Sequence, residues 1–208
     1  MPELVHFALL PGADRANEDL RHYCKDNKLN LIYEGTMRGT SVFLKIAKEF
    51  KAAGYEVDLA LMSVPKLASY GSTLLRYATD LMNDDTGRWV PKNVHDEAYE
   101  KIIVTLRELE KNKLFDKAEV YRRGTMDENG IPQLIYPTKG REFTGPIEAL
   151  TFGRDYYKKQ AIIDYEEIYE VVRDTFEKKA PSLLHSLKDW EKLYETELKQ
   201  QQSLDNSR

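Results

Sequence analysis

The sequence predicts an α/β domain, and three observations carry this prediction. Residues 29–33 form an apolar run and residues 55–63 alternate in polarity, as strands do. Between them, residues 43–53 repeat apolar side chains at helical spacing. Strand, helix and strand in this order predict a parallel pair joined by a right-handed crossover. From residue 161 onward the apolar residues recur every three or four positions, which predicts C-terminal helices.

The N-terminal elements follow from local patterns. Residues 4–10 are almost wholly apolar and end at Pro11-Gly12, so they fit either a buried strand or the first turns of a helix. We expect a polar helix over residues 14–27 and a strand over 29–33. Gly54 stands where the end of the next helix favours a residue with positive φ.

Helical signals return over residues 65–81, and the polar stretch 83–88 predicts a mobile loop. Pro91 can open the next helix. One apolar face of that helix is formed by Val94, Ala98, Ile102, Leu106 and Leu109. Residues 117–122 read as a strand, and residues 124–138 as a hairpin or an excursion, with Asn129-Gly130 as its turn signal.

The pattern divides the chain into an α/β domain at 1–160, a helical extension at 161–199 and a disordered polar tail at 200–208. A net charge of −4 gives no basic field for nucleic acid or an anionic membrane. No apolar run approaches the ~18 residues of a membrane span, so we expect a cytoplasmic protein. Cys24 is the sole cysteine, which excludes an internal disulfide.

The tripeptide Glu34-Gly35-Thr36 follows the predicted strand 29–33, where open α/β sheets bind their ligands. A carboxylate can accept hydrogen bonds from sugar hydroxyls, and a threonine hydroxyl can donate or accept. Glycine between them allows close backbone approach. The alternative is that Glu34 only caps the following loop.

Three arginines form a second candidate group. Arg38 follows the same strand, Arg76 lies on the helix predicted at 65–81, and Arg88 ends the predicted loop. Arginine pairs bidentately with phosphate, and a loop arginine can reach a transferring phosphoryl group. The alternative is that they are solvated, as most of the 31 lysines and arginines must be.

Other catalytic motifs are missing from the sequence. His95-Asp96 is expected to be a solvent-facing pair, because neighbours in sequence on a helix do not face each other. The four histidines show no metal-ligand spacing, so no metal site is expected. No G-x-x-x-x-G-K-[ST] occurs, so the usual backbone cradle for ATP phosphates is absent from these residues.

Taken together, several motifs resemble the middle of the zeta toxins. They are residues 31–38, 54–57, 59–61, 72–77 and 87–92 with His95-Asp96, and weaker similarity extends the resemblance over 20–123. Zeta toxins are P-loop kinases of bacterial toxin–antitoxin systems. They transfer the γ-phosphate of ATP to the 3′-hydroxyl of the amino sugar in UDP-N-acetylglucosamine, and a small helical antitoxin blocks them.

The resemblance implies a P-loop-kinase-like parallel sheet flanked by helices, with ATP and Mg²⁺ as cofactors. It implies that Glu34 and Thr36 contact the sugar nucleotide with Arg38 nearby. It also implies that Arg76 and Arg88 contact ATP phosphates and stabilise the transferring charge.

The sequence departs from the family before Glu34. The Walker lysine and the catalytic aspartate belong to a segment longer than the 33 residues that precede Glu34. We therefore expect an N-terminally truncated domain that is inactive alone, because phosphoryl transfer rests on positioning and charge neutralisation. Residues 4–10 are expected to fill the slot of the P-loop strand. A partner chain or self-association are the other ways to cover that sheet edge.

Two alternatives stay open at this point. The chain is either one half of a split kinase, whose P-loop another chain supplies, or a non-catalytic interaction protein. In the second case the Trp190-bearing C-terminal helix would be the working surface, and no binding that depends on Glu34 is expected.

Overall fold

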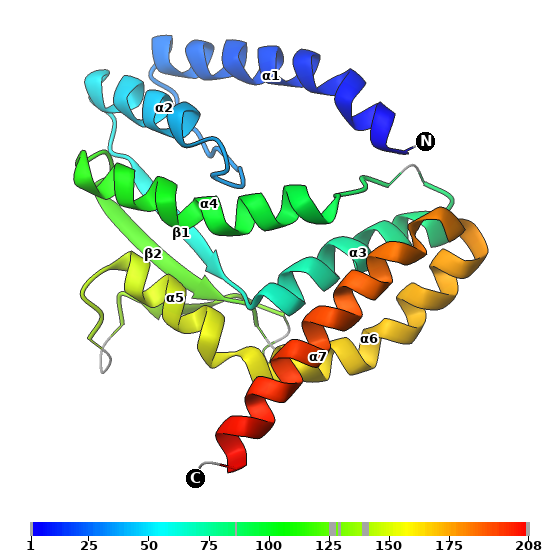
Figure 1. The fold of residues 1–208 in the computed structure, drawn as a ribbon. Coiled ribbons are helices and arrows are strands. Elements are labelled where there is room, and N and C mark those ends of the chain that lie inside the picture. The colour runs from blue at the N-terminus through cyan, green and yellow to red at the C-terminus, as the bar shows by residue number, and fades with distance from the viewer. Residues whose placement is uncertain (1, 86, 125–127, 129, 139–141, 207–208) are drawn as a thin grey trace. The chain divides into compact units, whose positions relative to one another are not determined.

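The computed structural model describes residues 2–85, 87–124, 128, 130–138 and 142–206 (Figure 1). Contacts divide the chain into two compact units, Met1–Asp58 with Asp96–Asp116, and Leu59–His95 with Lys117–Arg208. This division does not coincide with the boundary expected at residue 160. None of the helices described combines the length and apolar character that a membrane crossing needs.

The first unit contains helices α1 (Pro2–Asp26) and α2 (Thr40–Ala52) and most of α4 (Lys92–Lys111). Helix α2 is as predicted, and Gly54 after it has φ of +84°. The strand expected at residues 4–10 is wrong, because α1 runs through this segment. α1 continues past Pro11, although a proline inside a helix removes one backbone donor and crowds the preceding turn.

Residues 29–39 form an irregular connection, so the strand predicted at 29–33 is wrong. Strands are stabilised by their neighbours, and none of the described strands pairs with this segment. Ile32, which the pattern assigns to a buried strand, is 90% exposed. The expected strand–helix–strand unit therefore lacks its first strand.

The second unit holds a mixed sheet of order β1-β2-β3, formed by β1 (Asp58–Ser63, in this unit from Leu59), β2 (Lys117–Arg122) and β3 (Gln133–Tyr136). β1 and β2 run in the same direction (Figure 1), whereas β2 and β3 are antiparallel. This confirms the strand at 117–122 and the hairpin, and β1 occupies most of 55–63. In the predicted turn Gly130 has φ of +69°, and Asn129 lies outside the described residues.

Helices complete the second unit: α3 (Lys66–Met82), α5 (Pro146–Tyr156), α6 (Lys158–Lys179), the short η2 (Pro181–Leu183) and α7 (Leu184–Asn206). α3 and the C-terminal helices confirm the sequence pattern, whereas α5 was not predicted. The disordered tail expected from residue 200 is wrong up to Asn206, where α7 ends. Residues 207–208 lie outside the described part of the chain.

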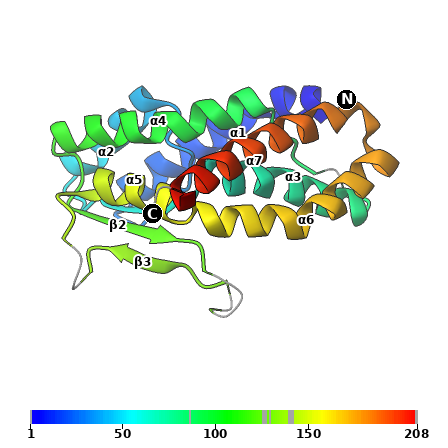
Figure 2. The ribbon, with the colours of Figure 1, turned by 60° about the horizontal axis from the view of Figure 1, so that its bottom comes forward.

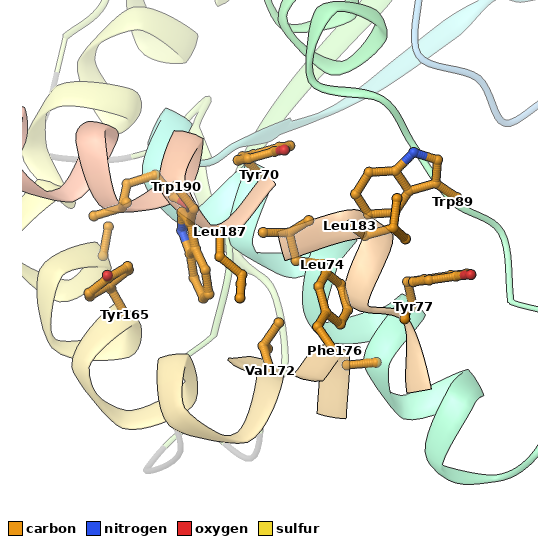
Figure 3. Packing of buried hydrophobic residues seen from close by; sticks show 14 of the residues in the cluster. Tyr70, Leu74, Tyr77, Trp89, Tyr165, Val172, Phe176, Leu183, Leu187 and Trp190 are labelled. Carbon is orange, nitrogen blue, oxygen red and sulfur yellow. The ribbon is translucent and has the colours of Figure 1, made fainter. Parts of the chain in front are cut away.

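The hydrophobic core of the second unit lies between α3, α6 and α7, which run side by side (Figure 2). Trp190 of α7 is 1% exposed, and its Nε1 donates a hydrogen bond to the Leu67 carbonyl over 3.1 Å. Phe176 of α6 packs edge-on against Tyr77 and Trp89 (Figure 3). Trp190 is thus a core residue, so its side chain is not part of any surface that α7 exposes.

Candidate functional site

The tripeptide Glu34-Gly35-Thr36 is exposed on the first unit, on a connection that is anchored on both sides. On one side the Tyr33 ring lies 5.8 Å from the Phe43 ring and under the Arg21 guanidinium, 5.3 Å away. On the other side Met37 is buried, and its carbonyl accepts a hydrogen bond from Thr105 Oγ1 over 2.7 Å. The polar side chains are therefore held in place without being covered.

Gly35 packs closely against the end of the Phe43 ring. A Cβ at this position would lie 2.8 Å from Cζ of Phe43, closer than side-chain carbons approach. Met37 has φ of +55°, a left-handed conformation that a non-glycine residue rarely adopts. Strain of this kind is held by its surroundings, here the buried Met37 side chain and the Thr105 hydrogen bond.

Glu34, Thr36 and Arg38 lie together on this connection, as their closeness in sequence demands. Glu34 and Thr36 have no hydrogen bond or ion pair to the part of the chain that the structure describes. Arg38 lies 3.8 Å from Glu97, and both side chains are about half exposed, so this pair holds Arg38 only weakly. The three side chains can therefore serve a ligand without breaking internal contacts of consequence.

Arg76 and Arg88 both belong to the second unit and are exposed. Each adjoins a buried aromatic residue: Tyr77 follows Arg76, Trp89 follows Arg88, and the two rings are 5.4 Å apart. Within the described residues neither guanidinium has an ion-pair partner. Buried neighbours thus fix the backbone of two arginines whose charges no described acidic residue neutralises.

The loop that carries Arg88 is fastened at several points. Lys179 of α6 donates hydrogen bonds to the Leu81 carbonyl (2.7 Å) and to Asp84 Oδ1 (2.6 Å). This hydrogen bond and the charge of Lys179 hold the pKa of the Asp84 carboxyl below its usual value. Gly87 packs on Asp80 so closely that a Cβ would lie 2.5 Å from the Asp80 Cβ.

His95 corrects a sequence prediction, because it is buried rather than solvent-facing. Its Nε2 lies 3.0 Å from Ser69 Oγ, and its ring is 5.2 Å from Tyr70. The first turn of α4 therefore packs His95 against α3. The polar residues Asp96 and Glu97, which follow His95 directly, favoured the solvent-facing interpretation.

The acidic residues that the structure describes form no metal site. Across the described ranges no three His, Cys, Asp or Glu side chains are grouped as metal ligands. Glu18 on α1 lies 3.3 Å from Lys45, whose hydrogen bond and charge lower the pKa of Glu18. Glu18 is thus a surface carboxylate with a surface partner, and Cys24 is a buried free thiol.

Sequence reasoning missed two residues that position the candidate site. Thr105 holds the Met37 carbonyl and lies 2.8 Å from the Thr40 hydroxyl. A threonine next to Leu106, on the apolar face of α4, was the available signal. No sequence pattern indicated Lys179, because Asp84, to which it donates a hydrogen bond, is far away in the sequence.

Comparisons with known proteins identify the family of this chain. The family model described as zeta toxin matches residues 9–129, more than half of the chain. The chain belongs to the zeta toxin family. Zeta toxins of Enterococcus hirae and Streptococcus pyogenes are 37% and 36% identical over 114 residues, which is 54% of this chain and 40% of each relative. The PezT toxin of Streptococcus pneumoniae is 37% identical over 97 residues, 46% of this chain and 38% of that toxin.

The matched stretch thus spans only about 40% of the length of these curated relatives. A solved structure from the PezAT chromosomal toxin–antitoxin system of Streptococcus pneumoniae superposes with a TM-score of 0.60 at 26% identity. It covers 78% of this chain and 62% of that chain. The predicted kinase-like α/β class with C-terminal helices is confirmed. All five predicted site residues lie inside the family match, whereas α5, α6 and α7 lie beyond it.

Proposed function

We propose that this zeta toxin family chain binds UDP-N-acetylglucosamine through Glu34 and Thr36, as the substrate side of a sugar-nucleotide kinase. The observation that carries the proposal is the exposed, uncommitted tripeptide between the anchored residues Tyr33 and Met37. The Glu34 carboxylate accepts hydrogen bonds from the sugar hydroxyls, and Thr36 supplies a hydroxyl beside it. Gly35 keeps the backbone open to the ligand and clear of Phe43.

Arg76 and Arg88 take the phosphates of ATP in this proposal. Two exposed guanidiniums without a carboxylate partner in the described residues fit phosphate oxygens, which arginine binds bidentately. ATP, when bound, supplies the phosphoryl group. Within the described part of the chain no three His, Cys, Asp or Glu side chains are grouped as a metal site, and no step is assigned to Mg²⁺.

An antitoxin is the protein partner that the family supports. The similar solved structure comes from a toxin–antitoxin system. We extend the proposal to a proteinaceous antitoxin that binds this chain, with the sugar nucleotide as the small-molecule ligand. The split-kinase alternative shares the substrate site, and in it a second chain supplies the phosphate cradle.

Calorimetric titration of UDP-N-acetylglucosamine into the full chain tests the substrate site. Glu34→Gln keeps the shape of the side chain and removes its charge. A hydrogen bond to a charged group contributes about 1.5–3 kcal/mol, so roughly a 10- to 100-fold loss of affinity is expected. Glu110→Gln, at an exposed position of α4, makes the same chemical change and is expected to bind as the wild type does.

Binding that Glu34→Gln leaves unchanged would sink the assignment of Glu34. If the wild-type chain gives no heat of binding at millimolar UDP-N-acetylglucosamine, the proposed substrate site is wrong. A non-catalytic interaction protein would then be the better description of this chain.

A further inference from the structure

Arg123 is an arginine that neither the motifs nor the comparisons single out. It directly follows β2, at the carboxyl end of a strand that runs parallel to β1, and it is exposed. Open α/β sheets bind ligands at this edge. Its position in the fold is therefore that of a ligand-binding residue.

The adjacent Arg122, in contrast, is held by internal contacts of its guanidinium group. Its guanidinium forms a two-pronged ion pair with Glu128, with Nη1 2.6 Å from Oε2, and lies 5.3 Å from the centre of the Tyr157 ring. Arg123 instead has a neutral partner: its Nη1 donates to Ser72 Oγ over 2.8 Å. Within the described residues it has no carboxylate.

Ser72 ties Arg123 to the arginine already proposed for phosphate binding. Ser72 and Arg76 are four residues apart in α3, so they lie one turn apart on the same face of the helix. The Ser72 hydroxyl donates its own hydrogen to the Ala68 carbonyl over 2.6 Å, which turns its lone pairs toward Arg123. The Arg123 guanidinium is thus held beside the turn that precedes Arg76.

All of these residues belong to the same compact unit. Arg76, Arg88 and Arg123 are exposed, and the described residues give none of them an acidic partner, although the whole chain is acidic with a net charge of −4. Arg76, on one face of α3, and Arg123, held by Ser72 on the same face, have no acidic partner among the described residues, and such guanidiniums fit an external anion. Planar forked donors suit phosphate oxygens better than they suit a single point charge.

We propose that Arg123 is a further phosphate-binding residue, held by Ser72, that contacts the same phosphate chain as Arg76. The inference rests on the proposed function, because the nucleotide of that reaction supplies the phosphates. Arg123 is a binding residue in this proposal, and Ser72 is a positioning residue that acts through it.

The test is a titration of the full chain with ATP and separately with inorganic tripolyphosphate, followed by heteronuclear NMR. Arg123→Gln is expected to weaken both ligands at least tenfold and by the same factor. Arg123→Lys is expected to recover only part of the loss, because lysine lacks the fork. Ser72→Ala is expected to cause a smaller loss in the wild-type background and none when combined with Arg123→Gln.

Arg107→Gln is the matched control, because Arg107 is an exposed arginine on α4 and the substitution removes the same charge. Far-UV circular dichroism verifies that each variant is folded. If Arg76→Gln abolishes ATP binding while Arg123→Gln binds like the control, the inference about Arg123 is overturned and the proposed nucleotide site stands. If the wild-type chain binds neither ATP nor tripolyphosphate, both fall.

Discussion

Gly71→Ala is the substitution whose effect the core defines most sharply. Gly71 lies in α3 directly beneath Trp190, and a Cβ there would lie 2.3 Å from Cζ2 and 2.6 Å from Cε2 of the indole. Atoms at such distances cannot coexist, so the ring must shift. The ring is 1% exposed and hydrogen-bonded to Leu67, so it has no room to shift without loss.

The expected magnitude is a balance of opposing effects. Alanine is favoured over glycine inside a helix by about 0.8–1 kcal/mol. Overpacking a close-packed core costs about 1–3 kcal/mol. Displacing the indole also weakens the hydrogen bond from Trp190 to the Leu67 carbonyl, which costs about 1 kcal/mol. The packing effects exceed the helical preference, and we expect Gly71→Ala to lower the free energy of unfolding by about 2 kcal/mol.

Urea unfolding followed by far-UV circular dichroism measures this change, and a double-mutant cycle identifies its cause. Phenylalanine lacks the second ring that carries Cζ2 and Cε2. In a Trp190→Phe background, Gly71→Ala is therefore expected to be neutral or to stabilise by up to about 1 kcal/mol. A Gly71→Ala variant at least as stable as the wild type, with Trp190 present, would refute the reasoning.

Three further predictions concern stability and local order. Thr105→Val removes the hydrogen-bond donor to the Met37 carbonyl, so we expect the free energy of unfolding to fall by about 1–2 kcal/mol. Amide hydrogen exchange around Glu34-Gly35-Thr36 should become faster, and unchanged exchange would contradict the role of Thr105 as an anchor. Because Lys179 lowers the pKa of Asp84, the stability that Asp84 adds is present above its unfolded pKa of about 3.9 and is lost as pH falls through the folded value. The wild type should therefore have a higher thermal unfolding midpoint than Asp84→Asn, and this difference should disappear only below about pH 4. A difference in midpoint that does not change with pH would argue against the Lys179–Asp84 pair. Burial and a hydrogen bond to a glutamate raise the pKa of Tyr169 to about 12, so its contribution is present below pH ~10 and is lost toward pH 12. In Tyr169→Phe the thermal unfolding midpoint should fall less between pH ~10 and pH 12 than in the wild type. The same fall in both proteins would show that other groups cause it.

Elements that local pattern alone can specify were predicted correctly. α2, α3 and β2 have clear periodicity and clear boundaries, such as Gly54 after α2. The strand at 29–33 failed because a strand exists only with a partner, and an apolar run does not reveal whether one is present. Residues 4–10 were ambiguous for the same reason: a short apolar run fits a helix and a strand equally well.

The candidate site was predictable where its residues stand next to recognisable element ends. Glu34 and Thr36 follow an apolar run, and Arg88 ends a polar loop, so position in the sequence indicated them. Arg123 escaped notice because it differs from Arg122 only through contacts made in the folded chain, which pair Arg122 with Glu128 and Arg123 with Ser72. Lys179 is 95 residues from Asp84, a separation that no local pattern spans.

The core shown in Figure 3 has a consequence for synthesis of the chain on the ribosome. Trp190 donates a hydrogen bond to the Leu67 carbonyl, 123 residues earlier in the chain. The apolar face of α3 is therefore fully covered only after α7 has been synthesised. At about 5–20 residues per second, translation takes roughly 6–25 s to cover that distance. During this interval Leu67 and Leu74 lack their final partners, and the nascent chain is exposed to aggregation or to capture by a chaperone. The helix that carries Arg76 thus reaches its final packing only after α7 has been synthesised, which delays any nucleotide site built on it.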